Sequence, residues 1–335
     1  MGAQLKVGPV EIPGRVWIAP MTGVSDLPFR QTAARLGAPY VATEMVACAQ
    51  FAGRRPDVVR RAAVGRGLPL MVVQLVGREP AWIAAGARLA FRAGAQIVDL
   101  NFGCPAKEVT GHLSGSALMR NLDLAEALIA AAVEAIDAPV SVKMRLGWDD
   151  ASRNAPELAA RAQAAGAAAI TVHGRTRGQF YAGVADWVAV RQVKSAVTIP
   201  VVVNGDVLDA GSARAALEAS GADGVMIGRG ATGRPWIAAA IAAGLDGRPA
   251  YEPSRQERAQ IVAEHLAASI RLYGEVLGVR MFRKHLAAYI SAAPWPSALE
   301  EKRAARARLC RLESARDIRA GLAALWSWRP SRLAA

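Results

Sequence analysis

The cysteine at position 104 has the widest chemical range of any residue in this sequence, and its neighbours restrict how it is held. Cys104 lies between Gly103 and Pro105 in the segment NFGCPAKEVTGHLSGSALM, residues 101–119. Glycine permits and proline imposes unusual backbone conformations, so we expect this loop to have a defined shape. A thiol held there could be a nucleophile, a metal ligand, a proton donor or a small buried residue. The loop alone leaves these roles open.

Eight short apolar runs are predicted to be β-strands that hold such loops in place. They cover residues 15–21, 40–45, 70–77, 97–103, 140–147, 169–176, 200–207 and 223–230. Near-continuous apolar runs are typical of parallel strands buried on both faces. Helical segments separate them, and eight strand–helix units in succession predict an α/β fold, a closed (β/α)8 TIM barrel. An open doubly wound sheet is the alternative, but it does not explain why the eight units match barrel closure without remainder.

Barrel geometry predicts where the chemistry lies, because active sites of this fold lie at the C-terminal ends of the strands. Every predicted strand ends in a polar or chemically versatile residue. The set contains no carboxylate cluster with metal spacing and no Ser–His–Asp arrangement, so we expect no metal in this site. Its members are Met21, Thr22, Glu44, Gln74, Asn101, Cys104, Lys143, Arg145, His173, Arg175, Asn204, Asp206, Gly228 and Arg229.

The donors in this set suit a large polar cofactor, and flavin mononucleotide (FMN) fits them well. The loops NGDVLDAGSA and GRGATGRPW follow the seventh and eighth strands, where barrels commonly bind phosphate. Gln74 and Asn204 could hydrogen-bond the flavin ring, and Lys143 could stabilise negative charge at its N1/C2=O edge. The alternatives are turn geometry for the glycines, a rim salt bridge for Lys143 and a packed barrel position for His173.

The chain changes character after the segment DGRPAYEPS, residues 246–254. Beyond it the sequence predicts only helices, so we expect a catalytic barrel over residues 1–245 and an α-helical bundle domain over residues 246–335. The formal net charge is +13, and residues 246–335 hold 16 lysines and arginines against 9 aspartates and glutamates, a net of +7. This excess favours an anionic partner, nucleic acid first. An arginine-rich composition without functional meaning is the alternative.

The three cysteines, Cys48, Cys104 and Cys310, are odd in number and far apart. Their spacing argues against a disulfide framework, a zinc site and a four-cysteine iron–sulfur cluster, and it suits the reducing cytoplasm. The N-terminus has no signal-peptide pattern. Because no apolar stretch reaches about 18 residues, we also expect no membrane span.

Several motifs together resemble the tRNA-dihydrouridine synthases. The most specific combination is NFGCPAKEV (101–109) with SVKMRLGW (141–148) and ITVHGRT (170–176) downstream. The segments LSGSALM (113–119) and RKH (283–285) look most like the bacterial B-type subfamily. The remaining matches are APMTGVSDLPFR (19–30), TEM (43–45), VQLVG (73–77), VNGD (203–206) and VMIGRGATGRPW (225–236).

This resemblance implies an FMN-dependent barrel that reduces the C5=C6 bond of a D-loop uridine in tRNA to 5,6-dihydrouridine, with NADPH as electron donor. Hydride would pass from flavin N5 to C6, and Cys104 would give the proton to C5. Asn101 and Cys104 would face the uracil, and Arg145, Arg175 and Arg177 are further candidates for substrate binding. Carried over by motif, the residues that line the flavin would be Pro20, Met21, Thr22, Gln74, Lys143, His173, Asn204, Gly205, Asp206, Gly228 and Arg229.

Cys104 suits the role of an acid, because an ordinary thiol pKa of about 8.5 leaves it mostly protonated at neutral pH. No base is needed beside it, and we expect a structural role for His112 in the same loop. Phe102, between Asn101 and Gly103, is a small departure from the family pattern that could affect uracil packing. Residues 292–302 carry no family motif that we recognise.

A uridine inside folded tRNA must leave its stack to reach a barrel mouth, and the body of the RNA then needs a second binding surface. The helical domain offers basic residues for it: Arg280, Arg283, Lys284, Arg303, Arg306 and Arg308. An ordinary solvated face is the alternative. Analogy with the B-type enzymes points to position 17 of the tRNA.

Two other functions compete with this interpretation. The first is an FMN dehydrogenase acting on a free pyrimidine, which would not need a basic helical domain. The second is a non-catalytic RNA-binding regulator on the same scaffold. The presence of Cys104, Lys143 and His173 together argues against the second.

Overall fold

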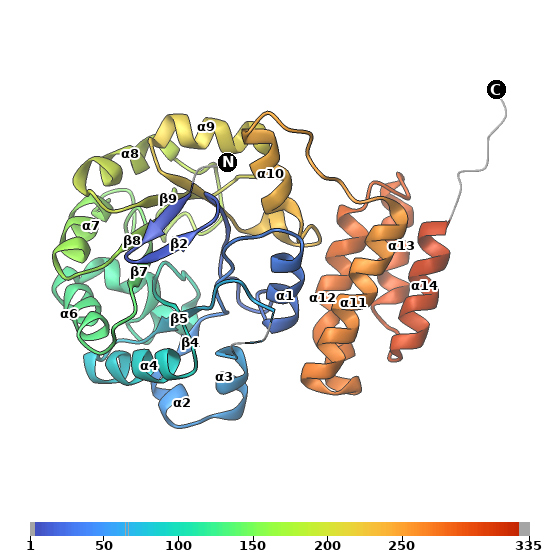
Figure 1. Cartoon of the computed structure of the whole chain (residues 1–335), viewed down its shortest axis with the longest axis horizontal. Helices are drawn as coiled ribbons and strands as arrows, with labels where there is room; N and C mark the ends of the chain where they lie inside the picture. The colour runs from blue at the N-terminus through green and yellow to red at the C-terminus, as the bar shows by residue number, and fades with distance from the viewer. Residues whose placement is uncertain (1–3, 64, 66, 328–335) are drawn as a thin grey trace.

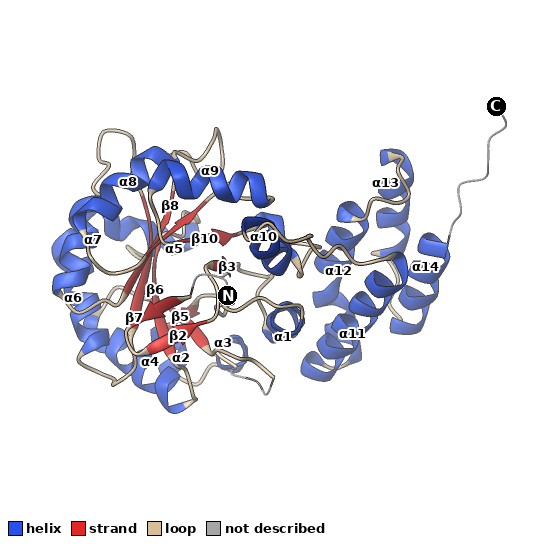
Figure 2. Ribbon diagram, turned by 45° about the horizontal axis from the view of Figure 1, so that its top comes forward, coloured by secondary structure: helices blue, strands red, loops and turns tan. Residues whose placement is uncertain are grey.

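The computed structural model describes residues 4–63, 65 and 67–327, and eight parallel strands form its central sheet. Neighbours in the sheet follow the order β3-β10-β9-β8-β7-β6-β5-β4, which returns the eighth strand to the first. Single bridges from Ile18 to Val41 and from Ala42 to Val72 complete the ring. The predicted (β/α)8 TIM barrel is therefore confirmed (Figure 2). The strands are β3 (Val16–Ile18), β4 (Val46–Ala47), β5 (Val72–Val76), β6 (Ile97–Phe102), β7 (Val140–Arg145), β8 (Ala169–His173), β9 (Val201–Asn204) and β10 (Gly224–Ile227).

The second strand differs from its prediction over residues 40–45. Val41 and Ala42 form only isolated bridges, and the regular strand is the short β4. The intervening Thr43 and Glu44 are buried, and Thr43 Oγ1 accepts a hydrogen bond from the backbone N–H of Gln74 at 3.0 Å. One side-chain hydrogen bond, to the backbone N–H of Gln74, therefore replaces a backbone bond between the strands here.

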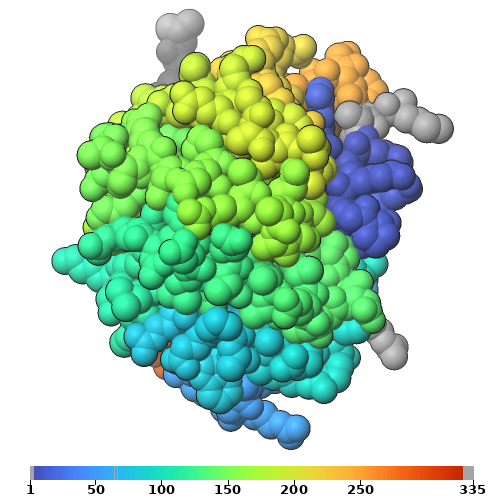
Figure 3. Space-filling model, turned by 90° about the vertical axis from the view of Figure 1, so that its left-hand side faces the viewer, coloured from blue at the N-terminus to red at the C-terminus, as the bar shows by residue number. Residues whose placement is uncertain are grey.

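Helices wrap the sheet because each presents an apolar stripe to it. In α6, Ala125, Leu128, Ile129 and Ala132 are buried, which is the spacing of one helix face. In the space-filling view the successive segments of the wall follow one another from blue through green to yellow (Figure 3). The helices of the barrel are α1 (Leu27–Arg35), α2 (Cys48–Ala52), α3 (Pro56–Arg61), α4 (Pro80–Arg92), α5 (Lys107–Thr110), α6 (Leu122–Val133), α7 (Ala155–Ala164), α8 (Trp187–Ala196), α9 (Ala210–Ser220) and α10 (Ile237–Leu245).

An N-terminal hairpin that the sequence analysis did not predict covers the other end of the barrel. It consists of β1 (Leu5–Val7) and β2 (Val10–Ile12), joined by a two-residue turn in which Gly8 has φ +56°. Gly8 lies against Pro139 and Ala168, which precede β7 and β8. The hairpin therefore closes the N-terminal ends of the strands and leaves their C-terminal ends to the candidate site.

In the part of the chain that the structure describes, four helices follow the barrel and lie beside it, with α11 packed against α1 (Figure 1). They are α11 (Arg255–Tyr273), α12 (Glu275–Ala292), α13 (Leu299–Leu309) and α14 (Ala315–Ser327). Their apolar core also includes Trp236 and Ala240 from the end of the barrel. The division at residues 245 and 246 stays a prediction, and residues 1–3 and 328–335 of the two predicted domains lie outside the described residues. Among the described residues, no helix is both long and apolar enough to cross a membrane.

Candidate active site

A cavity of about 990 Å³ lies at the C-terminal ends of the barrel strands. Its wall contains Cys104, Asn101 and Arg145, but not Arg175 or Arg177. All of the predicted cofactor-binding residues line it: Pro20, Met21, Thr22, Gln74, Lys143, His173, Asn204, Gly205, Asp206, Gly228 and Arg229. Barrel closure thus brings together residues that lie more than two hundred positions apart in the sequence.

A buried hydrogen-bond chain connects the interior of the barrel to the Cys104 loop. Asp99 on β6 accepts from Ser141 Oγ at 2.6 Å and from Gln74 Nε2 at 2.7 Å. Gln74 Oε1 accepts from Asn101 Nδ2 at 2.8 Å, and Asn101 Oδ1 accepts the backbone N–H of Cys104 at 2.9 Å. Burial raises the pKa of the Asp99 carboxyl to about 6, so it is largely ionised at neutral pH. These hydrogen bonds fix the orientations of the side-chain amides of Gln74 and Asn101.

Asp99 and Ser141 were not predicted as site residues from the sequence. Their only signals are a carboxylate inside the apolar run IVDLNF, in a strand buried over its whole length, and a hydroxyl inside VSVKM, where every residue except Lys143 is buried. A buried charge needs a partner, and that requirement could have marked Asp99 for attention.

The Cys104 loop is held from its C-terminal side as well. The backbone oxygen of Cys104 accepts from Ser116 N at 3.1 Å and from Ser116 Oγ at 2.8 Å. Gly115 has φ +60°, and a Cβ there would come within 2.9 Å of the Cys104 oxygen. Burial raises the pKa of the Cys104 thiol. The hydrogen bonds therefore anchor the backbone of Cys104, whose side chain is half-buried. Because its pKa is raised, the thiol is protonated at neutral pH.

Lys143 reaches the cavity from β7 and is oriented by an amide. Its Nζ donates to Asn204 Oδ1 at 2.9 Å, while Asn204 Nδ2 donates to the backbone oxygen of Met226 at 2.8 Å. Burial, followed by the Arg145 cation, lowers the pKa of Lys143 to about 8. The ammonium group thus lies in the cavity wall, and no carboxylate of the described residues forms an ion pair with it.

His173 is kept neutral by its surroundings. Burial, and then the neighbouring cations Lys143 and Arg145, lower its pKa to about 2. Its Nε2 lies 3.3 Å from Arg175 Nη1, and because a guanidinium has only donors, Nε2 must be the acceptor. The ring proton of His173 therefore resides on Nδ1.

Arg175 differs from its expected role as a substrate ligand. It is 1 % exposed, and its Nη2 donates to Asp206 Oδ2 at 2.6 Å and to Gly183 O at 2.7 Å. A guanidinium with these partners is not available to RNA. Arg175 instead fixes Asp206, a residue with φ +55° at the cavity wall.

Arg145 and Arg177 also have protein partners. Arg145 is buried and donates to the backbone oxygens of Gly103 at 2.8 Å and Phe180 at 2.9 Å, so it ties two loops of the site together. Arg177 lies outside the cavity wall, with its guanidinium 4.6 Å from the ring centre of Trp148. Substrate binding by Arg145 and Arg177 stays a prediction.

Two aromatic residues at the mouth were not predicted. Phe180 and Tyr181 line the cavity, and both are exposed, with ring centres 4.9 Å apart in an edge-to-face arrangement. The Arg229 guanidinium lies 4.9 Å from the Tyr181 ring centre. Adjacent aromatics in a glycine-bounded loop, GQFYAG, are the sequence signal that could have found them.

The sequence is similar to those of known proteins over most of its length. The sequence model of the family described as Dihydrouridine synthase matches residues 17–317. A probable tRNA-dihydrouridine synthase of Rhodobacter capsulatus is 53% identical over 292 residues, covering 86% of this chain and 90% of that protein. A tRNA-dihydrouridine synthase B of Pseudomonas putida is 42% identical over 292 residues, covering 87% and 86%.

Solved structures with the same fold are more distant in sequence. The 6-hydroxypseudooxynicotine amine oxidase of Pseudomonas geniculata superposes with a TM-score of 0.57 at 15% identity, covering 73% of this chain and 49% of that one. An old yellow enzyme homologue from Zymomonas mobilis gives 0.52 at 14% identity, covering 76% and 95%. These two likenesses concern the fold. The family match and the sequence relatives show that the chain belongs to the dihydrouridine synthase family, of the bacterial B type.

Proposed function

We propose that this chain is a tRNA-dihydrouridine synthase that reduces the C5=C6 bond of a D-loop uridine in tRNA, with FMN as its flavin and NADPH as electron donor. The observation that supports this most directly is the presence of Cys104, Asn101 and Lys143 in one cavity, in a chain of this family. We further propose that it works in the cytoplasm, on the position-17 uridine.

The cavity fits a flavin in size and in chemistry. Its volume of about 990 Å³ suits a large cofactor together with a base. A Cβ built on Gly228 would meet no atom of the described residues within 4 Å, so the backbone there faces open space. Together with Arg229 it offers N–H groups and positive charge to a phosphate. Pro20, Met21 and Thr22 follow the neighbouring strand β3 and also line the cavity.

The chemistry that a flavin bound in this cavity would supply is the transfer of a hydride to uracil C6. Lys143 places an ammonium group in the wall that stabilises negative charge on the cofactor side, and His173 presents its Nδ1–H as a neutral donor. Asn101 holds the backbone of Cys104 and thereby sets where the thiol lies. The thiol keeps its proton at neutral pH and delivers it to C5, where the reduced uracil requires one.

The helical region offers an exposed basic surface for the body of the tRNA. Arg303, Arg306 and Arg308 on α13 and Arg280 on α12 are exposed. Arg283 and Lys284 are partly buried, and Lys284 Nζ lies near Gly23 of the barrel. We therefore assign phosphate contact to the four exposed arginines and an interface position to Lys284.

The experiment is to incubate the purified protein with NADPH and an unmodified tRNA transcript, and then to digest the RNA and weigh its nucleosides. We expect one uridine to gain two hydrogens, and sequencing of the RNA to place it in the D-loop. Free uridine, tested in parallel, should remain unreduced. Reduction of free pyrimidine alone would instead indicate a free-base dehydrogenase, and a colourless protein that takes up no flavin would indicate a regulator.

A further inference from the structure

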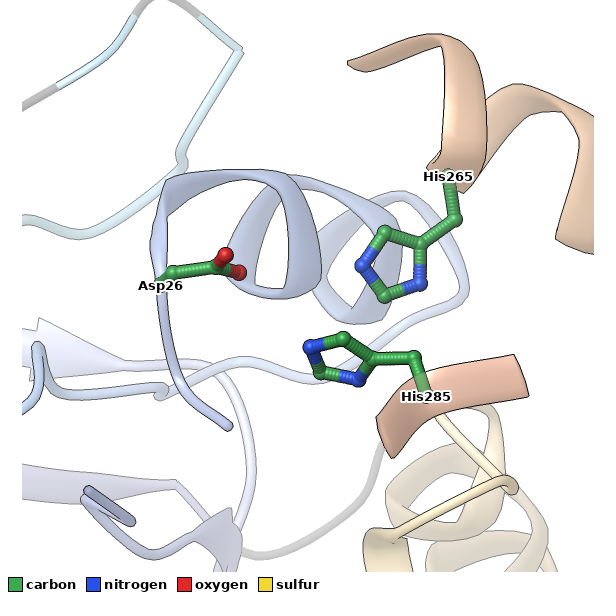
Figure 4. A group of neighbouring side chains, drawn as sticks. All are labelled: Asp26, His265 and His285. Carbon is green, nitrogen blue, oxygen red and sulfur yellow. The ribbon is translucent and has the colours of Figure 1, made fainter. Parts of the chain in front are cut away.

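Three buried side chains meet where the barrel contacts the helical region. Asp26 precedes α1, His265 lies in α11, and His285 lies in α12 (Figure 4). Their exposed fractions are 3 %, 0 % and 2 %. One ligand-type atom of each lies within 4.8 Å of the corresponding atoms of the other two.

Both histidines lack a partner at Nε2. Among the described residues, His265 Nε2 and His285 Nε2 are buried without a hydrogen bond, and both rings turn these atoms toward the Asp26 carboxylate (Figure 4). Leaving buried polar atoms unsatisfied costs free energy. Two imidazole nitrogens that converge on a carboxylate are a donor set for a metal ion.

We propose that Asp26, His265 and His285 bind a divalent transition-metal ion, zinc by the chemistry of these ligands, and so join the barrel to the helical region. A point within about 2.8 Å of all three ligand atoms exists, because none of them is more than 4.8 Å from another. Zinc–nitrogen and zinc–oxygen bonds are about 2.0–2.2 Å. Movements of less than about 1 Å therefore complete the site, with water as fourth ligand.

Surrounding groups hold the ligands in this orientation. Tyr289 Oη lies 3.0 Å from His265 Nδ1, and Tyr273 Oη donates to Asp26 Oδ2 at 3.0 Å. Metal-bound imidazoles and carboxylates characteristically have such outer hydrogen bonds. Phe29 stacks on His285 with ring centres 5.8 Å apart, and this contact restricts rotation of the imidazole.

The neighbouring charges favour a transition metal over magnesium or calcium. Arg30, Lys284 and Glu44 all interact electrostatically with Asp26. The two cations offset the two carboxylates, so no excess of negative charge attracts a hard cation. Affinity must come from the imidazole nitrogens, which select zinc and its neighbours. The cysteine pattern that argued against zinc does not concern these ligands.

Metal binding here would act close to the active site. Asp26 follows Ser25, whose Oγ accepts the backbone N–H of Met21 at 2.9 Å, and Met21 lines the cavity. The ion would therefore fix the helical region, with its exposed arginines, relative to the cavity mouth. This role is additional to the proposed reaction and requires no change in it.

The test is elemental analysis of protein made without a histidine tag in zinc-supplemented medium. We expect about one zinc ion per chain, falling at least about tenfold in His285→Gln and His265→Asn. His112→Gln, a change of an exposed histidine, serves as the matched control and should keep the metal. Circular dichroism shows whether each variant is folded.

A milder variant keeps the proposal testable if the ligand variants do not fold. Tyr289→Phe retains the ring and removes only the hydroxyl beside His265, so we expect zinc affinity to fall about 10- to 100-fold. Cobalt added to the chelator-treated protein should give the visible absorption of a tetrahedral site. Folded wild-type protein that binds neither zinc nor cobalt above the level of the His285→Gln variant would overturn the proposal, whether or not the protein reduces tRNA.

Discussion

The Asn101 side chain accepts the backbone N–H of Cys104 at 2.9 Å while its own amide nitrogen donates to Gln74 at 2.8 Å. The position of the thiol therefore depends on an amide orientation that is set deeper in the barrel. Asp99 sets it, because a carboxylate can only accept and so must face the Gln74 N–H.

The first prediction concerns Asp99. In Asp99→Asn an NH₂ group replaces one of the two carboxylate oxygens that accept from Gln74 and Ser141, so one hydrogen bond of the buried network is lost. We expect the free energy of unfolding to fall by about 1–3 kcal/mol and turnover to fall with it. Urea denaturation and a tRNA assay measure the two effects. The exposed Glu218→Gln should change neither, and equal stability of both variants would contradict the assignment.

The second prediction concerns pH. Burial lowers the pKa of Lys143 to about 8, so its ammonium form is present below that pH and is lost above it. Turnover should therefore fall as the pH rises through about 8. Lys143→Arg keeps a charge that does not titrate in this range, and its profile should stay level until the Cys104 thiol ionises. If the turnover of Lys143→Arg still falls near pH 8 as in the wild type, a group other than Lys143 titrates there.

The third prediction concerns the ion pair between Arg175 and Asp206. Asp206→Asn leaves the Arg175 guanidinium buried without its counter-charge, so the free energy of unfolding should fall by about 3–5 kcal/mol. Thermal denaturation provides the measurement. Asp57→Asn breaks an exposed pair with Arg55 and should leave Tm unchanged. If both variants change Tm by a similarly small amount, solvent must stabilise the Arg175 charge when Asp206 is replaced.

The fourth prediction concerns the basic surface of α13. Reversing the charge of Arg303 and Arg306 to glutamate should raise KM for tRNA and lower its salt dependence, with kcat retained. Arg88→Glu reverses an exposed arginine on α4 of the barrel and provides the control. If the two variants respond alike, the tRNA is bound by general charge and α13 has no special part.

The succession of apolar runs and helical segments sufficed to predict the barrel, because apolar runs end where polar residues begin and barrel closure brings those ends together. The eleven predicted cofactor-binding positions came from family motifs; all of them line the cavity, and their role in binding a cofactor stays a prediction. Asp99 was not predictable in this way, since its partners Gln74 and Ser141 lie on two other strands. Arg175 was misjudged for a related reason. A sequence does not show whether an arginine beside a barrel mouth faces solvent or its own loop.

The histidines at the interface show the same limit over a longer distance. His265 and His285 lie on two helices, and both meet Asp26 only when α11 packs against α1 and α12 packs against α11. Each helix contributes only one of the two histidines, so neither helix alone has the spacing of ligands that would indicate a metal site. The hairpin β1–β2 escaped prediction because each of its strands has three residues, too few for a periodic pattern.

The proton-donor role of Cys104 is the central claim, and the oxidative half-reaction tests it most directly. Enzyme reduced with NADPH is mixed with unmodified tRNA, and flavin reoxidation is followed in a single turnover for wild type, Cys104→Ala and the control Cys310→Ser. We predict that all three bind flavin and accept electrons from NADPH equally. Reoxidation by tRNA should slow about 10²- to 10⁴-fold in Cys104→Ala alone. Reoxidation of Cys104→Ala at the wild-type rate, with dihydrouridine formed, would contradict the account.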